Sequence, residues 1–310
     1  MPFTPQSGGS PRYGRMNLAI ALAQILAWAG TLTALSIVQN WPVRILLIVF
    51  FSLMMQGVFS LMHEAIHGQG HPDRRLNQAI GLLTGVLFGT AYTLFRVNHE
   101  GHHVRNRTPA ELSEFILPGE VAWKKVVLYY FAVLGGIWLG SVIASLFIPW
   151  LPYSARHRLA RPRQSMDGYA LSFAQFSPSD WTTFRLDSLC LWLFWGGIVS
   201  FGPWPVWQLM MAYAAFGFSW SSLQWVYHLR TPLHPIEGAY DLRAPAPIRW
   251  LMLNFCYNLS HHRQPRRPWQ ELPSISRPGE TQPLWYRYLG IFRPPVALPQ
   301  DLRALEKRYF

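Results

Sequence analysis

The sequence has little charge and very few cysteines for its length. Only 14% of the 310 residues are charged, and 15 residues are acidic. Soluble domains usually carry about a quarter of charged residues, so the composition disfavours a purely water-soluble protein. The two cysteines, Cys190 and Cys256, lie in apolar sequence, which excludes a disulfide framework and a cysteine-based metal site.

The shortage of acidic residues leaves a formal net charge of +12. A basic protein can bind nucleic acid, but no aromatic and basic recognition module is visible, so we expect no nucleic-acid partner. We expect Lys and Arg instead to hold one face of a membrane protein in the cytosol. The 15 Trp, 13 Tyr and 19 Phe also suit a protein with aromatic residues at both membrane interfaces.

What the sequence does have is histidine in three short clusters, which hold seven of the 11 histidines. The clusters are His63-Glu-Ala-Ile-His67, His99-Glu-Gly-His102-His103 and Asn258-Leu-Ser-His261-His262. Imidazole is a common metal ligand, and this number of imidazoles predicts more than one bound ion.

Long uncharged segments around the clusters predict membrane-spanning helices. Residues 16–43 carry no charge, and the apolar run 45–62 leads directly into the first cluster. Residues 188–227 are also uncharged and are interrupted by the turn signal Phe201-Gly-Pro-Trp-Pro205, so they predict a second hairpin that ends beside His228. We therefore expect an all-α integral membrane protein with about four transmembrane helices in two hairpins.

Two further apolar segments do not fit a simple hairpin. Residues 76–95 connect two clusters that must meet on one membrane side, so we expect a re-entrant or interfacial helix there. Residues 126–155 are long enough for one span, with a bend at Gly135-Gly136, but the arginine-rich loop that follows has cytosolic character. The path of this second segment stays open.

The two ends of the chain are more polar than its middle. Residues 1–15 are rich in Pro, Gly and Ser and predict a disordered cytosolic tail. Residues 16–310 are expected to form a single membrane domain, in which the histidine clusters belong to a cytosolic cap. Residues 270–310 are expected to form a cytosolic C-terminal extension.

Helical spacing divides the candidate ligands between two ions. His99 and His103 share one helix face, whereas His102 points roughly 100° away from His103, so one helical turn can supply two ions. His228 adds an eighth histidine at the end of a predicted span, and His234 competes for that role. Asn258 offers a neutral oxygen, either as a direct ligand or to hold a metal-bound water. Such an imidazole-rich set favours iron or copper in oxygen chemistry.

Other polar residues near the clusters receive supporting roles or none. Glu64 and Glu100 each neighbour a candidate ligand, and His71 follows His67 by four residues, so we expect them to orient imidazoles through the outer N–H. We expect no ligand role for the isolated His157. Trp225 and Tyr227 are candidates for a substrate pocket or for simple helix packing.

Two other classes of protein compete with an oxygen-activating enzyme. His63-Glu64-Ala-Ile-His67 matches the H-E-x-x-H pattern of zinc proteases, in which Glu64 would be the general base of an intramembrane protease. That reading leaves most of the other histidines without a use. A metal transporter would place histidines at mid-membrane on facing helices, whereas these lie at the ends of spans and in polar segments.

The order H-x3-H, H-x2-H-H and x3-H-H, followed by Pro265 and Pro268-Trp269, resembles the integral-membrane fatty acid desaturase superfamily over about residues 45–275. That superfamily also includes lipid and alkane hydroxylases and carotenoid ketolases. The resemblance implies a di-iron oxidase domain that uses O2 to abstract hydrogen from an unactivated C–H bond. The metal ligands it implies are His63, His67, His99, His102, His103, His228, His261 and His262, with Asn258 in place of the leading histidine of the third cluster.

The resemblance also implies a fatty acid or lipid substrate and an external source of electrons. The sequence has no fused cytochrome b5-like element and no nucleotide-binding glycine fingerprint, so we expect a separate donor such as a ferredoxin. Arg263, Arg266 and Arg267 are candidates for docking it, or for contacting lipid headgroups. A bacterial inner membrane, with the active site on the cytoplasmic face, is the expected location.

The reaction itself stays open within the superfamily. A desaturase-type reaction on a fatty acyl chain is the leading hypothesis. The alternatives are oxidative decarboxylation of a free fatty acid to a terminal alkene, hydroxylation of a lipid and ketolation of a carotenoid. The same two irons could serve each reaction, because the outcome depends on where the substrate lies.

Overall fold

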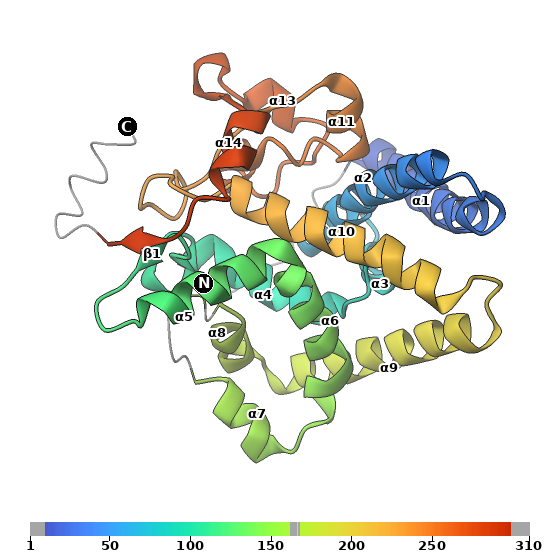
Figure 1. Ribbon diagram of the computed structural model, residues 1–310, viewed down its shortest axis with the longest axis horizontal. Helices are drawn as coiled ribbons and strands as arrows, with labels where there is room; N and C mark the ends of the chain where they lie inside the picture. The colour runs from blue at the N-terminus through green and yellow to red at the C-terminus, as the bar shows by residue number, and fades with distance from the viewer. Residues whose placement is uncertain (1–9, 162–165, 167, 299–310) are drawn as a thin grey trace.

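The protein is mainly helical in the part of the chain that the structure, a computed structural model, describes: residues 10–161, 166 and 168–298 (Figure 1). Strand is confined, within these residues, to two parallel pairs of two-residue segments: β1 (Phe115–Ile116) with β4 (Val296–Ala297), and β2 (Leu242–Arg243) with β3 (Gln282–Pro283). The prediction of an all-α fold is confirmed.

A first hairpin consists of α1 (Pro11–Ile37) and α2 (Trp41–Ile66), which lie side by side in Figure 1. The side chain of Asn40 caps α2 by accepting a hydrogen bond from the Val43 backbone N–H. Because α1 begins at Pro11, where proline suits the first helical turn, the expected disordered tail is wrong for residues 11–15. Residues 1–9 of that tail lie outside the described residues.

The segment between the first two clusters forms a sharply bent helix pair, α3 (Arg74–Phe88) and α4 (Tyr92–Arg105). The two helices meet at 101° across a short break, where Gly89 takes the left-handed conformation at φ 91°. The bend lets α4 bring its histidines to the end of α2, as the expected re-entrant path requires.

The segment whose path was open forms a long broken helix. It consists of α5 (Ala122–Phe131), the π-helical turn η2 (Ala132–Gly136), α6 (Ile137–Phe147) and the 3-10 turn η3 (Ile148–Trp150). The bend expected at Gly135-Gly136 is present, because Gly135 lies at φ 122° inside η2. Over its whole length the segment is apolar and long enough to cross a membrane.

A second hairpin consists of α9 (Pro178–Phe201) and α10 (Val206–Val226), which are joined by a turn at the right of Figure 1. Three shorter elements precede it on the way from α4: η1 (Pro109–Glu111), α7 (Tyr153–Leu159) and α8 (Gly168–Gln175).

Four helical segments of the described chain are long and apolar enough to span a membrane: Pro11–Ile37, Trp41–Ile66, Ala122–Trp150 and Pro178–Phe201. The expected number is confirmed, and residues 122–150 are among the four, whereas α10, which we predicted as a span, is not. α10 turns polar side chains toward its neighbours. Gln208 donates to the Leu32 carbonyl oxygen, and Ser219 accepts a hydrogen bond from Gln56 of α2.

A cap follows α10 and gathers at one end of the molecule, where Figure 1 shows it in orange and red. Its helices are α11 (Ala246–Leu251), α12 (Asn258–Arg263), α13 (Leu272–Ile275), the 3-10 turn η4 (Pro278–Glu280) and α14 (Leu284–Gly290). Trp269 ties the cap to the first hairpin, because its backbone N–H donates to Glu64 and its indole N–H donates to Asn17.

Candidate metal centre

Eight histidines that are far apart in the sequence converge in two adjacent groups. Within each group the ring nitrogens available as ligands lie within 4.8 Å of one another. The five-histidine group consists of His63, His67, His99, His103 and His261. The three-histidine group consists of His102, His228 and His262.

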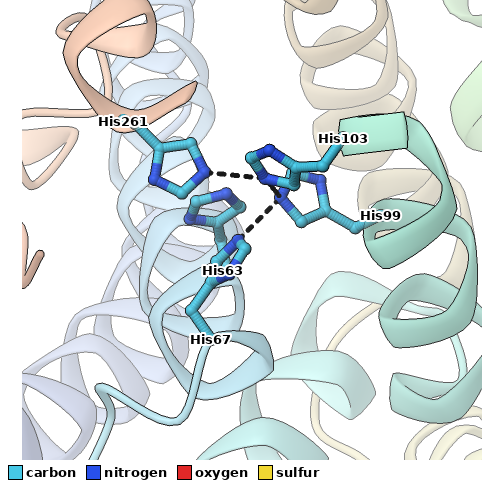
Figure 2. Close-up of side chains that lie close together, drawn as sticks. All are labelled: His63, His67, His99, His103 and His261. Carbon is cyan, nitrogen blue, oxygen red and sulfur yellow. Dashed lines mark hydrogen bonds between the residues drawn. The ribbon is translucent and has the colours of Figure 1, made fainter. Parts of the chain in front are cut away.

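The five-histidine group is built from three helices (Figure 2). His63 lies in the last turn of α2 and His67 caps that helix, while His99 and His103 share one face of α4. His261 reaches the same point from α12. The i, i+4 spacing therefore brings two pairs of imidazoles together, and the cap supplies the fifth.

The ring nitrogens of this group form a chain of contacts that hydrogen bonding alone cannot satisfy. His99 Nε2 lies 2.9 Å from His67 Nε2 and 3.0 Å from His103 Nε2. His103 Nε2 is in turn 3.0 Å from His261 Nε2. A ring nitrogen of neutral imidazole carries either one proton or one lone pair, so these three contacts cannot all be hydrogen bonds at once. Lone pairs that converge in this way suit a bound cation.

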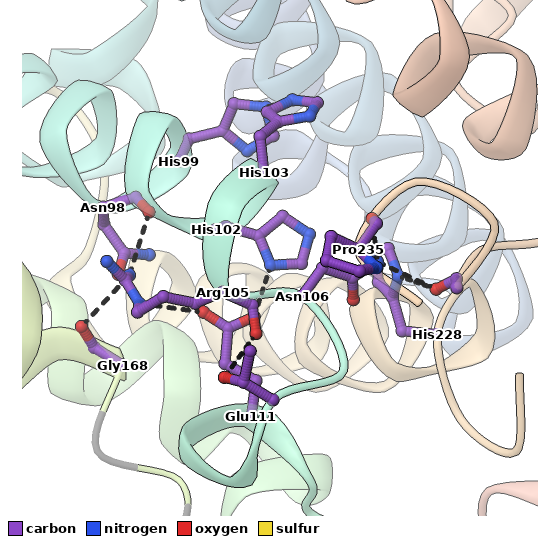
Figure 3. Close-up of polar contacts among 12 residues, drawn as sticks. Asn98, His99, His102, His103, Arg105, Asn106, Glu111, Gly168, His228 and Pro235 are labelled. Carbon is purple, nitrogen blue, oxygen red and sulfur yellow. Dashed lines mark hydrogen bonds and ion pairs between the residues drawn. The ribbon is translucent and has the colours of Figure 1, made fainter. Parts of the chain in front are cut away.

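The three-histidine group takes one histidine from each of three segments. His102 comes from α4, His228 follows α10 and His262 comes from α12, with ring centroids 4.7 to 5.2 Å apart. His102 Nδ1 lies 2.6 Å from a carboxylate oxygen of Glu111, and His228 Nδ1 lies 2.9 Å from the Gly238 carbonyl oxygen (Figure 3). These contacts leave Nε2 of His102 and His228 available as ligands.

Burial keeps the imidazoles in the form that binds metal. Burial, with a smaller contribution from neighbouring histidines, lowers the pKa of His261 and of His262 well below the usual range. Burial likewise lowers the pKa of His228. A neutral imidazole keeps a lone pair for a metal ion, so burial favours metal binding over protonation.

Several buried polar atoms at the centre have no hydrogen-bond partner among the described residues. They are His63 Nε2, His261 Nδ1, both ring nitrogens of His262, and Asn258 Oδ1. Folded proteins satisfy nearly all of their buried polar atoms, so such a concentration marks a place where ligation is expected. Two sets of neutral imidazoles fit two transition-metal ions.

The remaining histidines lie elsewhere. His234 is not the eighth member, because its Nδ1 accepts hydrogen bonds from the backbone N–H groups of Ile236 and Glu237 within a turn. His157 stacks on Tyr153 in α7, with ring centroids 6.0 Å apart.

Glu64, Glu100 and His71 make contacts other than the orienting ones that we expected. Glu64 accepts a hydrogen bond from the Trp269 backbone, Glu100 pairs with Arg96, and His71 accepts one from the Asp73 backbone. None of the three hydrogen-bonds to a histidine in the described part of the chain.

The same contacts exclude the zinc-protease arrangement. A protease site would pair His63 and His67 with one more ligand and use Glu64 as the base, but three further imidazoles join the two histidines. Glu64 instead ties α2 to the cap. Sequence reasoning missed Glu111, which does contact an imidazole. It follows His102 by nine residues across a turn, so no local spacing could have identified it.

The three arginines after the third cluster differ in their surroundings. Arg263 is held by two carboxylates, those of Glu237 and Glu280. Arg267 forms a half-exposed pair with Glu271, and Arg266 is exposed at the surface. The charge of Arg263 is therefore largely compensated inside the cap. A residue that docks an acidic partner is expected to keep its charge available at the surface.

A cavity of about 440 Å³ ends at the histidines. Its apolar wall comes from the broken helix 122–150 and from α8, including Leu128, Phe131, Ala132, Ile137, Ala144 and Phe173. The other end is formed by members of both groups and by Asn258, namely His63, His99, His102, His228 and Asn258. Trp225 also lines the cavity, whereas Tyr227 is buried against Phe255 outside the lining.

Comparison with known proteins agrees with this arrangement. A family model described as fatty acid desaturase matches residues 39–292, which contain all eight converging histidines. A Bacillus subtilis (strain 168) protein described as "Fatty acid desaturase" is 20% identical over 315 residues. That match covers 89% of this chain and 86% of the Bacillus protein.

Proposed function

Because this chain belongs to the fatty acid desaturase family, whose members are membrane di-iron oxidoreductases with histidine clusters, we propose that it introduces a double bond into a fatty acyl chain. The observation that carries the proposal is the cavity, which joins an apolar wall to an eight-histidine centre. An alkyl chain bound there would place one of its C–H bonds beside the ligands.

The metal ligands are assigned from the two groups. We assign His63, His67, His99, His103 and His261 to one iron, and His102, His228 and His262 to the other. Asn258 completes the second set, either directly or through a water, because its buried Oδ1 has no hydrogen-bond partner among the described residues and it lines the same cavity as His102 and His228. Two irons held here would supply the O2-dependent oxidation of an unactivated C–H bond.

The cavity has the properties that an acyl chain requires. Its wall consists mainly of aliphatic and aromatic side chains, which bind methylene groups and exclude water from the oxidation. Besides the histidines and Asn258, the polar lining residues include Asn98, Asn106, Glu111 and Gln224. The apolar wall therefore selects a hydrocarbon chain, while the headgroup must lie outside the apolar part.

The proposed reaction balances with an external reductant. Two neighbouring CH2 groups each lose one hydrogen, a C=C bond forms, and O2 is reduced to two molecules of water. The substrate supplies two of the four electrons and two of the four protons for that reduction. A donor must deliver the other two electrons, and the medium supplies the other two protons. We propose a ferredoxin-like carrier that docks near Arg266 and Arg267, which lie at the surface four and five residues after His262.

The centre is proposed to face the cytoplasm of a bacterial cell. Its support is the net charge of +12 and the arginines that surround the histidine-rich cap, since Lys and Arg are retained on the cytosolic side. The candidate spans support a bilayer location for the enzyme, where a lipid-borne acyl chain would also lie.

Product analysis tests the proposed reaction. Cells that express the protein with a redox partner would receive isotope-labelled fatty acids, and the lipids would be analysed by gas chromatography with mass spectrometry. We expect a labelled internal alkene, which is absent from cells that express His262→Ala. A labelled alcohol would contradict desaturation and indicate hydroxylation. A labelled ketone would indicate ketolation, and a terminal alkene one carbon shorter would indicate oxidative decarboxylation.

A further inference from the structure

One carboxylate contacts a proposed iron ligand directly, and it belongs to a residue with no role in the proposed function. Glu111 lies in η1, nine residues after His102, and its Oε2 is 2.6 Å from His102 Nδ1. The three-histidine group thereby differs from the five-histidine group, in which no imidazole hydrogen-bonds to a carboxylate within the described residues.

We propose that Glu111, held in place by Arg105, is the positioning residue that fixes His102 as a ligand of the second metal ion. The inference rests on the proposed metal centre. A carboxylate only accepts hydrogen bonds, so it holds the imidazole proton on Nδ1 and leaves the Nε2 lone pair for the metal. The same contact fixes the plane of the ring, because both the carboxylate and the N–H have directional preferences.

Arg105 holds the other oxygen of Glu111. Its Nε lies 3.3 Å from Glu111 Oε1, and its guanidinium also contacts the Gly168 carbonyl oxygen and the Ser172 hydroxyl, each at 3.3 Å. Gly168 and Ser172 belong to α8, which forms part of the cavity wall. Figure 3 shows this path from Gly168 through Arg105 and Glu111 to His102. The position of the ligand is therefore tied to the wall of the proposed substrate site.

Gly101 makes room for this arrangement. A Cβ atom at Gly101 would lie 2.0 Å from Arg105 Nη1 and 2.7 Å from Arg105 Cζ. The guanidinium thus lies directly against the bare backbone of α4, in the turn between His99 and His103. Any side chain at this position must shift the guanidinium that holds Glu111, although it changes neither the carboxylate nor the imidazole.

The test measures metal retention in full-length protein purified in detergent. Wild type, Glu111→Gln and the control Glu100→Gln would be loaded with ferrous iron, exposed to increasing chelator and analysed for iron per chain. Glu111→Gln loses the charged acceptor with almost no change of shape, whereas Glu100 pairs with Arg96 and touches no imidazole. Loss of such an orienting group typically weakens metal binding by about ten- to a hundredfold.

We expect Glu111→Gln to release one iron at about ten- to a hundredfold lower chelator concentration than wild type, while the other iron is retained. Mössbauer spectra should lose one iron site, and the thermal unfolding of the metal-free variant should match that of metal-free wild type. Glu100→Gln should behave as wild type. Retention of both irons with wild-type affinity in Glu111→Gln would overturn the inference.

A second variant covers the case in which Glu111→Gln does not accumulate in the membrane. Gly101→Ala should also weaken one iron site selectively, because it moves Arg105 and frees Glu111. Unchanged iron affinity in Gly101→Ala would then count against the role of Arg105 and Glu111. Failure of wild type to bind two irons would instead reject the proposed metal centre, so the two failures are distinguishable.

Discussion

The two histidine groups are assembled in different ways, although they lie side by side. The five-histidine group contains two helical pairs four residues apart, His63 with His67 and His99 with His103. Local helical structure alone therefore brings the two members of each pair together. The three-histidine group takes one imidazole from each of three segments. Its geometry therefore depends on tertiary contacts.

Protein oxygen atoms orient two imidazoles of the three-histidine group. His102 is oriented by Glu111, and His228 is oriented by the Gly238 carbonyl oxygen. The imidazoles of the five-histidine group instead crowd against one another with ring nitrogens about 3 Å apart. The geometry of one proposed metal site is therefore set by helix spacing, and that of the other is set by the residues around it. Changes outside the ligands should therefore disturb the three-histidine site more.

Removal of one ligand from each group should have the largest effect. We expect His103→Ala and His262→Ala each to abolish product formation, because each truncates a proposed ligand of a different iron. Both variants should still be found in the membrane fraction. His262 lies outside the candidate spans, and His103 lies in the bent helix pair and not in any of the four single candidate spans. Gas chromatography of the lipids and immunoblotting of the membranes are the measurements. Turnover by either variant would break the two-iron comparison.

Asp241→Ala should disturb both groups together. Asp241 is buried and accepts hydrogen bonds from the Ser260 backbone, the Ser260 hydroxyl and the Ser276 hydroxyl. These contacts hold α12, which supplies His261 to one group and His262 to the other. Loss of the shared acceptor should lower the free energy of unfolding by roughly 3 kcal/mol.

Thermal unfolding in detergent and iron content measure the outcome for Asp241. We expect a lower melting temperature and weaker retention of both irons, in contrast to the loss of one iron in Glu111→Gln. Glu271→Ala is the matched control, because it removes a carboxylate from a partly exposed pair in the same cap. Selective loss of one iron in Asp241→Ala would show that α12 does not couple the groups.

Ala132→Phe should impair the substrate cavity without altering either group. Ala132 is buried in η2 and lines the cavity, so a phenyl ring there takes space from the acyl chain. We expect product from long chains to fall by roughly tenfold, with iron content unchanged. Val127→Phe is the control, because Val127 is 60% exposed on the same broken helix and does not line the cavity. Equal effects of the two substitutions would contradict this use of the cavity.

The ion pairs of the cap should give a small dependence of stability on pH. Hydrogen bonds from Arg263 lower the pKa of Glu237 and of Glu280 from their ordinary value of 4.5. A lowered pKa stabilises the fold above 4.5, and this contribution is lost as the pH falls through the lowered values. The melting temperature of wild type should therefore fall slightly more than that of Arg263→Gln between pH 7 and pH 4. An equal fall in both would show that the pairs contribute nothing.

Substitution of His157 should have the smallest effect. This histidine is stacked on Tyr153 in α7 and belongs to neither group. We expect His157→Ala to retain wild-type iron content and product yield. A dead or iron-deficient His157→Ala variant would mean that the assignment of the ligands to the two groups is wrong.

The sequence was most informative where function depends on local spacing. The i, i+4 pairs predicted which histidines share a helix face, and the uncharged runs predicted the α1–α2 hairpin and the turn between α9 and α10. It was least informative about partners brought together by the fold. Neighbours in sequence such as Glu64 and Glu100 were natural candidates for orienting imidazoles, yet the fold assigns that contact to Glu111.

The spans show the same division. The uncharged residues 188–227 predicted two membrane helices, but α9 alone of the two is a candidate span, and α10 places Gln208 and Ser219 against the neighbouring helices. Charge alone could not separate a lipid-facing helix from one packed among others. Residues 122–150, whose path the arginine-rich loop obscured, form an apolar helical segment long enough to be the fourth span.

Metal analysis of the detergent-purified wild type is the most direct test of the two-site account. Protein expressed with ample iron would be analysed for all transition metals, and the result would be divided by the number of chains. The account predicts about two irons per chain, one for each histidine group. About one zinc per chain, with no iron, would contradict it.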